Sequence, residues 1–149
     1  MPGTFTSLHY HVVFSTKDRL PMIHADLQPR LYEYIGGIVR SLNAYPDEIG
    51  GMPDHIHLLV RVPPVIALSD FMRVVKSKSS GWIHETFPAS SKFAWQEGYG
   101  AFAVSKSDLP RVRAYIQGQA EHHRKTTFQD EFRKFLKAHE IEFEERYLW

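Results

Sequence analysis

Apolar and polar side chains alternate near the start of the chain and follow a helical spacing further along. The even positions from Leu8 to Phe14 are apolar, and this period of two predicts a strand. Residues 25–44 carry an apolar side chain every three or four positions, which predicts an amphipathic helix. A short strand over 48–51 and a longer, apolar strand over 55–62 are predicted to follow.

The second half of the chain is predicted to form a helix, a strand and two further helices. Ser69 is suited to cap the start of the second helix, and residues 93–104 read as a strand with a bulge. A third helix begins near Ser107 and carries Tyr115, and a last helix carries the aromatic residues from Phe128 onward. The order strand, helix, strand, strand, helix, strand predicts a ferredoxin-like, RRM-like α+β sandwich. We expect an antiparallel sheet with helices on one face, and an additional tyrosine-bearing helix; the open face is free to carry a site.

Composition limits the class of protein without naming a function. The 149 residues suit one domain over 1–149, and the 43% hydrophobic content suits a globular chain. The absence of cysteine excludes disulfides and thiolate chemistry. No apolar run approaches the roughly 20 residues of a membrane span, and no signal peptide is evident, so we expect a cytoplasmic protein. With a net charge of only +1, nucleic-acid binding would need a local basic face.

Two histidines stand one residue apart at the start of the predicted strand 55–62. Successive side chains of a strand point to opposite faces, so His55 and His57 project from the same face. That spacing suits two imidazole ligands of a divalent metal. The alternative is a pair of half-buried structural histidines held by hydrogen bonds.

The third predicted helix adds a possible nucleophile and a further ligand. Tyr115 and Gln119 are four residues apart and therefore one turn apart on one helical face, and His122 and His123 follow. A neighbouring apolar stripe can dock this helix on the sheet: Leu109, Val112, Ile116 and Ala120. Tyrosine is a poor nucleophile at neutral pH because its ordinary pKa is about 10, and a metal that polarises the electrophile would offset this weakness. The alternative is a partly buried tyrosine beside a solvent-facing glutamine.

Together these motifs resemble the small single-tyrosine HUH transposases of insertion sequences. The resemblance rests on His-hydrophobic-His at 55–57 and on Tyr-Ile-x-x-Gln-x-Glu-His-His at 115–123. It extends to residues 10–17 with Arg19, to 53–59 and 98–105, and to the Phe-x-x-Glu-Phe segment that begins at 128, so it covers nearly the full chain. It also implies that the cell is prokaryotic. Related two-tyrosine nucleases carry another tyrosine where this chain has glutamine, which favours the single-tyrosine class.

The resemblance implies an enzyme that cuts and rejoins single-stranded DNA at the ends of a mobile element. By position, Tyr115 would attack a backbone phosphate to leave a 5′-phosphotyrosine and a free 3′-hydroxyl. His55, His57 and Gln119 would hold Mg²⁺ or Mn²⁺, which would stabilise the charge that develops on the phosphate.

The resemblance also implies a homodimer in which the tyrosine helix of one subunit completes the histidine pair of the other. The apolar stripe of the last helix and the tail 143–149 suit either such an interface or the core of a monomer. The DNA would be single strands folded into hairpins at the element ends. The candidate DNA contacts are Lys17, Arg19, Arg73, Lys76, Lys78, Arg124 and Lys125, each of which is alternatively a solvated surface charge.

Other readings stay open at this point. A phosphohydrolase could use the histidine pair without covalent catalysis, and an RRM-like module could bind single strands without cleaving them. A host-adapted relative would retain the chemistry but mobilise no element. Asp54 either supports the histidine pair or only forms a turn, and the roles of His9, His11 and His84 are undecided.

Overall fold

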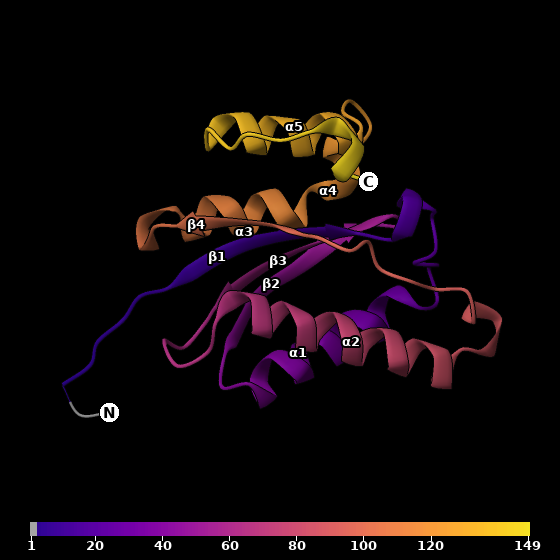
Figure 1. Cartoon of the computed structure of the whole chain (residues 1–149), viewed down its shortest axis with the longest axis horizontal. Coiled ribbons are helices and arrows are strands. Elements are labelled where there is room, and N and C mark those ends of the chain that lie inside the picture. The colour runs from indigo at the N-terminus through magenta and orange to yellow at the C-terminus, as the bar shows by residue number, and fades with distance from the viewer. Residues whose placement is uncertain (1–2) are drawn as a thin grey trace.

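A four-stranded antiparallel sheet lies between two layers of helices in the computed structural model, which describes residues 3–149 (Figure 1). The strands are β1 (His9–Ser15), β2 (Tyr45–Met52), β3 (His55–Arg61) and β4 (Gly100–Val104), in the order β2-β3-β1-β4. Helices α1 (Gln28–Ser41) and α2 (Leu68–Thr86) cover one face. Helices α3 (Leu109–Gln117), α4 (Gln119–His122) and α5 (Phe128–Ala138) lie over the other. Short 3-10 helices are η1 (Lys17–Arg19), η2 (Pro88–Ser90), η3 (Lys106–Asp108) and η4 (Glu145–Tyr147). The succession β1-α1-β2-β3-α2-β4 confirms the predicted ferredoxin-like α+β fold.

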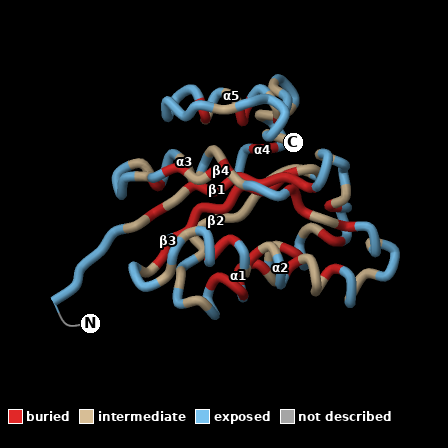
Figure 2. Tube along the Cα trace, viewed as in Figure 1, coloured by how far each residue is buried: buried red, intermediate tan, exposed pale blue. Residues whose placement is uncertain are grey.

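The alternation of side chains divides the two central strands between two layers. Even-numbered residues such as Phe14 and Leu58 are fully buried against α1 and α2, where the main hydrophobic core lies (Figure 2). Odd-numbered residues face α3, α4 and α5. His57 stands opposite Val13 of β1 and Gly50 of β2, so the histidine pair lies at the start of an inner strand of the sheet.

The second face of the sheet is covered, whereas we expected helices on one face only and an open face opposite. Phe128, Phe132 and Leu136 of α5 pack on Val13 and Phe102 of the same chain. An apolar stripe on a helix must be buried against something, and here the nearest apolar surface is the chain's own sheet. In this structure the apolar stripe of the last helix therefore packs in the core of its own chain, the second of the two alternatives given for it.

Several element boundaries differ from the predictions. The strand expected over 93–104 is confined to β4, and Trp95 makes only an isolated bridge with Thr16, because residues 96–99 form a loop. Helix α2 begins at Leu68 after Ala67, so Ser69 lies inside the first turn and caps nothing. Among residues 3–149, none of the helices combines the length and the apolar character needed to cross a membrane.

The third predicted helix is broken. Gly118 leaves the helical conformation (φ −91°, ψ 18°) and separates α3 from α4. The break changes which side chains turn inward: Gln119 is buried, and Ala120, which we expected in the docking stripe, is exposed. Leu109 and Ile116 are buried against Leu59 as expected.

Candidate metal and nucleophile centre

His55 and His57 project side by side from β3 into the layer formed by α3, α4 and α5. Both are completely buried, and their ring centroids lie 5.1 Å apart. Asp54 precedes the pair and contacts the Nδ1 atom of His55 at 2.7 Å. Phe128 of α5 stacks on the His55 ring at 4.2 Å. The strand and the helix layer together fix the orientation of the pair.

Glu131 of α5 lies at the middle of the centre. One carboxylate oxygen, Oε1, is 2.9 Å from His57 Nε2, 3.3 Å from His123 Nε2 and 3.6 Å from His55 Nε2. Only 2% of Glu131 is exposed, so its carboxylate is almost completely excluded from solvent. Burial would raise the pKa of Glu131, but the hydrogen bonds from His57 and Tyr115 outweigh it and hold that pKa well below its usual range. Glu131 is therefore a buried anion that accepts hydrogen bonds from His57 and Tyr115.

The ligand-type atoms of the centre converge with their lone pairs facing one another. Asp54 accepts a hydrogen bond from Nδ1 of His55, and the Thr126 carbonyl accepts one from Nδ1 of His123 at 2.7 Å. With the proton of each ring at Nδ1, the Nε2 atom faces the Gln119 Oε1 oxygen, at 3.1 Å for His55 and 3.0 Å for His123. Lone pairs at these distances repel unless a cation or added protons lie among them. His55, His57, His123 and Glu131 have ligand atoms within 4.8 Å of one another, so the donor set fits a divalent metal.

His11 of β1 contacts the ring of His57. Its Nε2 atom lies 2.7 Å from Nδ1 of His57. Burial and then repulsion from His57 lower the pKa of His11 to about 3, and burial lowers that of His57 to about 4 although Glu131 opposes the shift. Both rings are therefore neutral at pH 7, the form in which imidazole binds metals. The contact indicates that His11 orients the His57 ring, a role that the sequence left undecided.

Tyr115 reaches the same carboxylate from α3. Its hydroxyl donates to Oε2 of Glu131 and lies 3.1 Å from Nε2 of His122. The Tyr115 ring centroid is 5.8 Å from that of His57. Burial first, and then the Glu131 charge, raise the pKa of Tyr115 above its ordinary value. In this arrangement the phenol is held protonated beside the histidine pair of its own chain.

Helix α3 sits close to the sheet because β2 presents a glycine to it. A Cβ on Gly50 would lie 2.7 Å from both the carbonyl oxygen and the Cγ2 atom of Ile116. Ile116 follows Tyr115 directly, and Gly50 is paired with His57 in the sheet. The absence of a side chain at this position therefore sets how closely the tyrosine approaches the histidines.

The structure brings together four predicted site residues and adds two that sequence reasoning missed. Tyr115, Gln119, His55 and His57 all meet; Glu131 and His123 complete the cluster. The signals that could have found the two missed residues are His123 four positions after Gln119, and Glu131 on the aromatic stripe of α5, where a carboxylate is out of place.

The remaining polar candidates divide between the two sides of the sheet. Lys17 and Arg19 lie in η1 after the end of β1, and Arg124 and Lys125 follow α4 near the centre. Arg73 pairs with Asp70, and Lys76 donates to the carbonyls of residues 96–98, so these two have partners within α2 and its neighbouring loop. Their contact with DNA stays a prediction. His84 bonds the Phe93 carbonyl at 2.7 Å, a role in holding the loop after α2.

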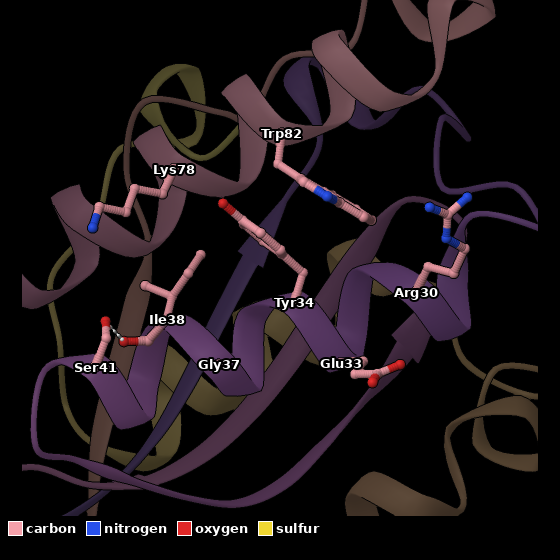
Figure 3. A pocket seen from close by; sticks show the side chains of 8 residues that line it. All are labelled: Arg30, Glu33, Tyr34, Gly37, Ile38, Ser41, Lys78 and Trp82. Atoms are coloured by element: carbon pink, nitrogen blue, oxygen red, sulfur yellow. Dashed lines mark hydrogen bonds between the residues drawn. The ribbon is translucent and has the colours of Figure 1, made fainter.

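Lys78 lines a hollow on the opposite side of the molecule. The hollow measures about 470 Å³. It lies between α1 and α2 (Figure 3), and there Tyr34 stacks on Trp82 with ring centroids 4.6 Å apart. The sheet and the main hydrophobic core separate it from the histidine pair. It is therefore not part of the candidate centre.

Comparison with known proteins assigns the chain to a family. The profile of the family described as "Transposase IS200 like" matches residues 4–119, which include both histidines, Tyr115 and Gln119. This chain belongs to the IS200-like transposases. Its curated relatives include the transposase for insertion sequence element IS200 of Salmonella typhimurium, 31% identical over 122 residues, covering 75% of this chain and 76% of the relative. The ISDra2 transposase TnpA of Deinococcus radiodurans is 24% identical, over 78% of this chain and 87% of the relative.

Solved structures share the fold of this IS200-like chain. A transposase structure from Deinococcus radiodurans R1 aligns with a TM-score of 0.65 at 23% identity, over 80% of this chain and 95% of the other. A REP-associated tyrosine transposase bound to a REP hairpin aligns with a TM-score of 0.62 at 16% identity, over 83% and 72%. Helix α5 and the tail lie beyond the residues matched by the family profile, so the profile does not include Glu131, which its contacts with His57 and Tyr115 place in the centre.

Proposed function

We propose that this transposase cuts and rejoins single-stranded DNA by transesterification through a covalent 5′-phosphotyrosine at Tyr115. The observation that supports the proposal is the meeting of the Tyr115 hydroxyl, His57 and His55 around one buried carboxylate. A tyrosine hydroxyl beside a cluster of neutral imidazoles and hard oxygens is what metal-assisted attack on a phosphodiester needs.

The reaction exchanges one phosphoester for another. The Tyr115 oxygen forms a bond to the scissile phosphorus, the bond from phosphorus to the 3′ oxygen breaks, and the 3′ oxygen leaves as a hydroxyl. The phenolic proton must depart as the bond forms, and two groups lie in contact with it: Glu131 Oε2 and His122 Nε2. Rejoining is the reverse, in which a 3′-hydroxyl attacks the phosphotyrosine and Tyr115 recovers a proton. The energy of the broken phosphodiester is conserved in the intermediate.

The metal, Mg²⁺ or Mn²⁺, would be held by His55 and His57 together with oxygen donors. Gln119 offers its amide oxygen and Glu131 a carboxylate oxygen, and His123 is the third imidazole within reach. When bound, such an ion supplies Lewis-acid stabilisation of the charge that develops on the phosphate. Asp54 and the Thr126 carbonyl hold the proton of His55 and His123 at Nδ1, which keeps each Nε2 available.

The DNA we propose is a single strand that folds into a hairpin at the end of a mobile element. The REP-associated transposase structure, which is bound to a REP hairpin, supports this class of substrate. The homodimer with composite sites stays a prediction from the family resemblance. In the chain described by the structure, Tyr115 already lies beside its own histidine pair, which supports a centre assembled within one chain.

The test is to incubate the protein with Mg²⁺ and labelled single strands from the DNA that flanks its gene, and to analyse the products on a denaturing gel. We expect a protein–DNA adduct that is lost in Tyr115→Phe and on chelation but kept in Tyr34→Phe, whose tyrosine lies behind the sheet. Cleavage that persists in Tyr115→Phe without an adduct would instead indicate a phosphohydrolase. Metal-independent binding without cleavage would indicate an RRM-like module.

A further inference from the structure

A second hollow, which we name the tail pocket, lies beside the candidate centre. It measures about 460 Å³, within the range of small-molecule sites, and is lined by η1, the loop 94–98 and the tail 146–149. Its Trp149 wall contacts Phe128 with ring centroids 6.1 Å apart, and Phe128 stacks on His55. The rings of Trp149 and Phe128 therefore lie between the tail pocket and His55.

Hydrogen bonds fix the three segments that form the pocket. The Lys17 amide donates to the Ala94 carbonyl at 2.8 Å, and the Gln96 amide donates to the Ser15 carbonyl at 2.9 Å. The buried Gln96 side chain accepts from the Ser15 amide and donates to the Leu148 carbonyl at 3.3 Å, so it ties β1 to the tail. The Lys76 ammonium donates hydrogen bonds to the backbone carbonyls of residues 96–98. The pocket is thus built by the fold.

Aromatic faces and cations line the pocket together. Trp95, Tyr147 and Trp149 supply the rings. Lys17 and Arg146 supply positive charge, and Arg146 is also paired with Glu144 at 2.7 Å. Arg19 and Arg133 lie over the Trp149 ring at 5.1 Å and 5.5 Å, outside the pocket lining. The Nε atom of Arg19 is buried and has no hydrogen-bond partner within residues 3–149.

This combination of groups is typical of single-strand recognition. Bases stack on aromatic rings while neighbouring cations follow the phosphates. The carboxylates of Asp18 and Glu97 at the same pocket disfavour a phosphate in its interior but can accept from the N–H groups of a base. The chemistry therefore suits a base inside the pocket and its phosphates at the rim, near Lys17 and Arg19.

We propose that the tail pocket receives one unpaired base of the DNA strand, adjacent to the scissile phosphate. The inference rests on the proposed function, because the strand must pass the histidine pair for a neighbouring base to reach the pocket. A base held there would fix the register of the strand, so the tail pocket would help to choose which phosphate meets Tyr115.

The test uses the full-length Tyr115→Phe protein, which binds without forming an adduct, and an oligonucleotide selected on it from a random single-stranded pool. Tyr147→Ala removes a pocket wall whose side chain is 72% exposed, so folding is not at risk. The matched control is Tyr45→Ala: Tyr45 is also exposed and also lies under an arginine, but on the edge strand β2. We expect Tyr147→Ala to weaken binding by about fivefold to a hundredfold, and Tyr45→Ala to leave it unchanged.

Scanning the oligonucleotide with single abasic positions then identifies the base. We expect one position at which loss of the base weakens binding to the parent protein but not to Tyr147→Ala. Equal abasic profiles for the two proteins would overturn the pocket proposal. That result is distinct from failure of the proposed function, which would appear as no covalent adduct in the protein that retains Tyr115.

Discussion

Adding a single methyl group at Gly50 tests whether the approach of α3 to the sheet controls the chemistry. In Gly50→Ala the new Cβ would lie 2.7 Å from the carbonyl oxygen of Ile116, a backbone atom that no rotamer change can remove. Helix α3 must therefore retreat by about 0.7 Å or more to reach an ordinary contact, and it carries Tyr115 with it. A displacement approaching 1 Å at a reacting group costs up to about a hundredfold in rate. Overpacking should also lower the free energy of unfolding by about 1–3 kcal/mol.

The assay is the rate of adduct formation at saturating Mg²⁺ and DNA, with folding checked by circular dichroism. Gly37→Ala in α1 is the matched control because a Cβ there meets no atom within 4 Å. We expect Gly37→Ala to react at the parent rate, with a stability equal to the parent's or higher by up to about 1 kcal/mol. A folded Gly50→Ala protein that reacts at the parent rate would refute the claim that this contact positions the tyrosine.

Two further predictions concern the ligands and the assembly. Glu131→Gln should lower the affinity for Mn²⁺ by about tenfold or more, as measured by titration calorimetry without DNA. The control Glu142→Gln, at an exposed position, should leave that affinity unchanged. An unchanged affinity in Glu131→Gln would show that this carboxylate is not a metal ligand. Mixing Tyr115→Phe with His57→Ala should restore no adduct if each centre forms within one chain, whereas recovery of activity in the mixture would establish composite sites in a dimer.

The central sheet and the histidine pair could be predicted because both depend on local periodicity. A period of two fixes which face of a strand each residue occupies, so His55 and His57 had to share one. The relation of Tyr115 to the pair was harder, since it depends on how α3 docks across a connection of about fifty residues. The glycine contact that sets this docking is visible only in three dimensions.

The role of Glu131 and the tail pocket were not predicted, for a related reason. The charge of Glu131 is stabilised by His57, which is 74 residues away in the sequence. A single carboxylate on the aromatic face of a helix does not indicate which distant residue it contacts. Gly118 interrupts the predicted third helix, so the burial of Gln119 depends on this break and not on helical spacing alone. Trp149 contacts Phe128, next to the histidine pair, because α5 folds back over the sheet.

Mapping the covalent bond tests the central claim most directly. Trypsin should release residues 114–124 as one peptide, and Tyr115 is its only tyrosine. After reaction with a single strand, nuclease trimming and mass spectrometry, we expect this peptide to carry a 5′-linked nucleotide on Tyr115. Attachment to another residue, or cleaved DNA with no modified peptide, would contradict the tyrosine mechanism proposed for this chain.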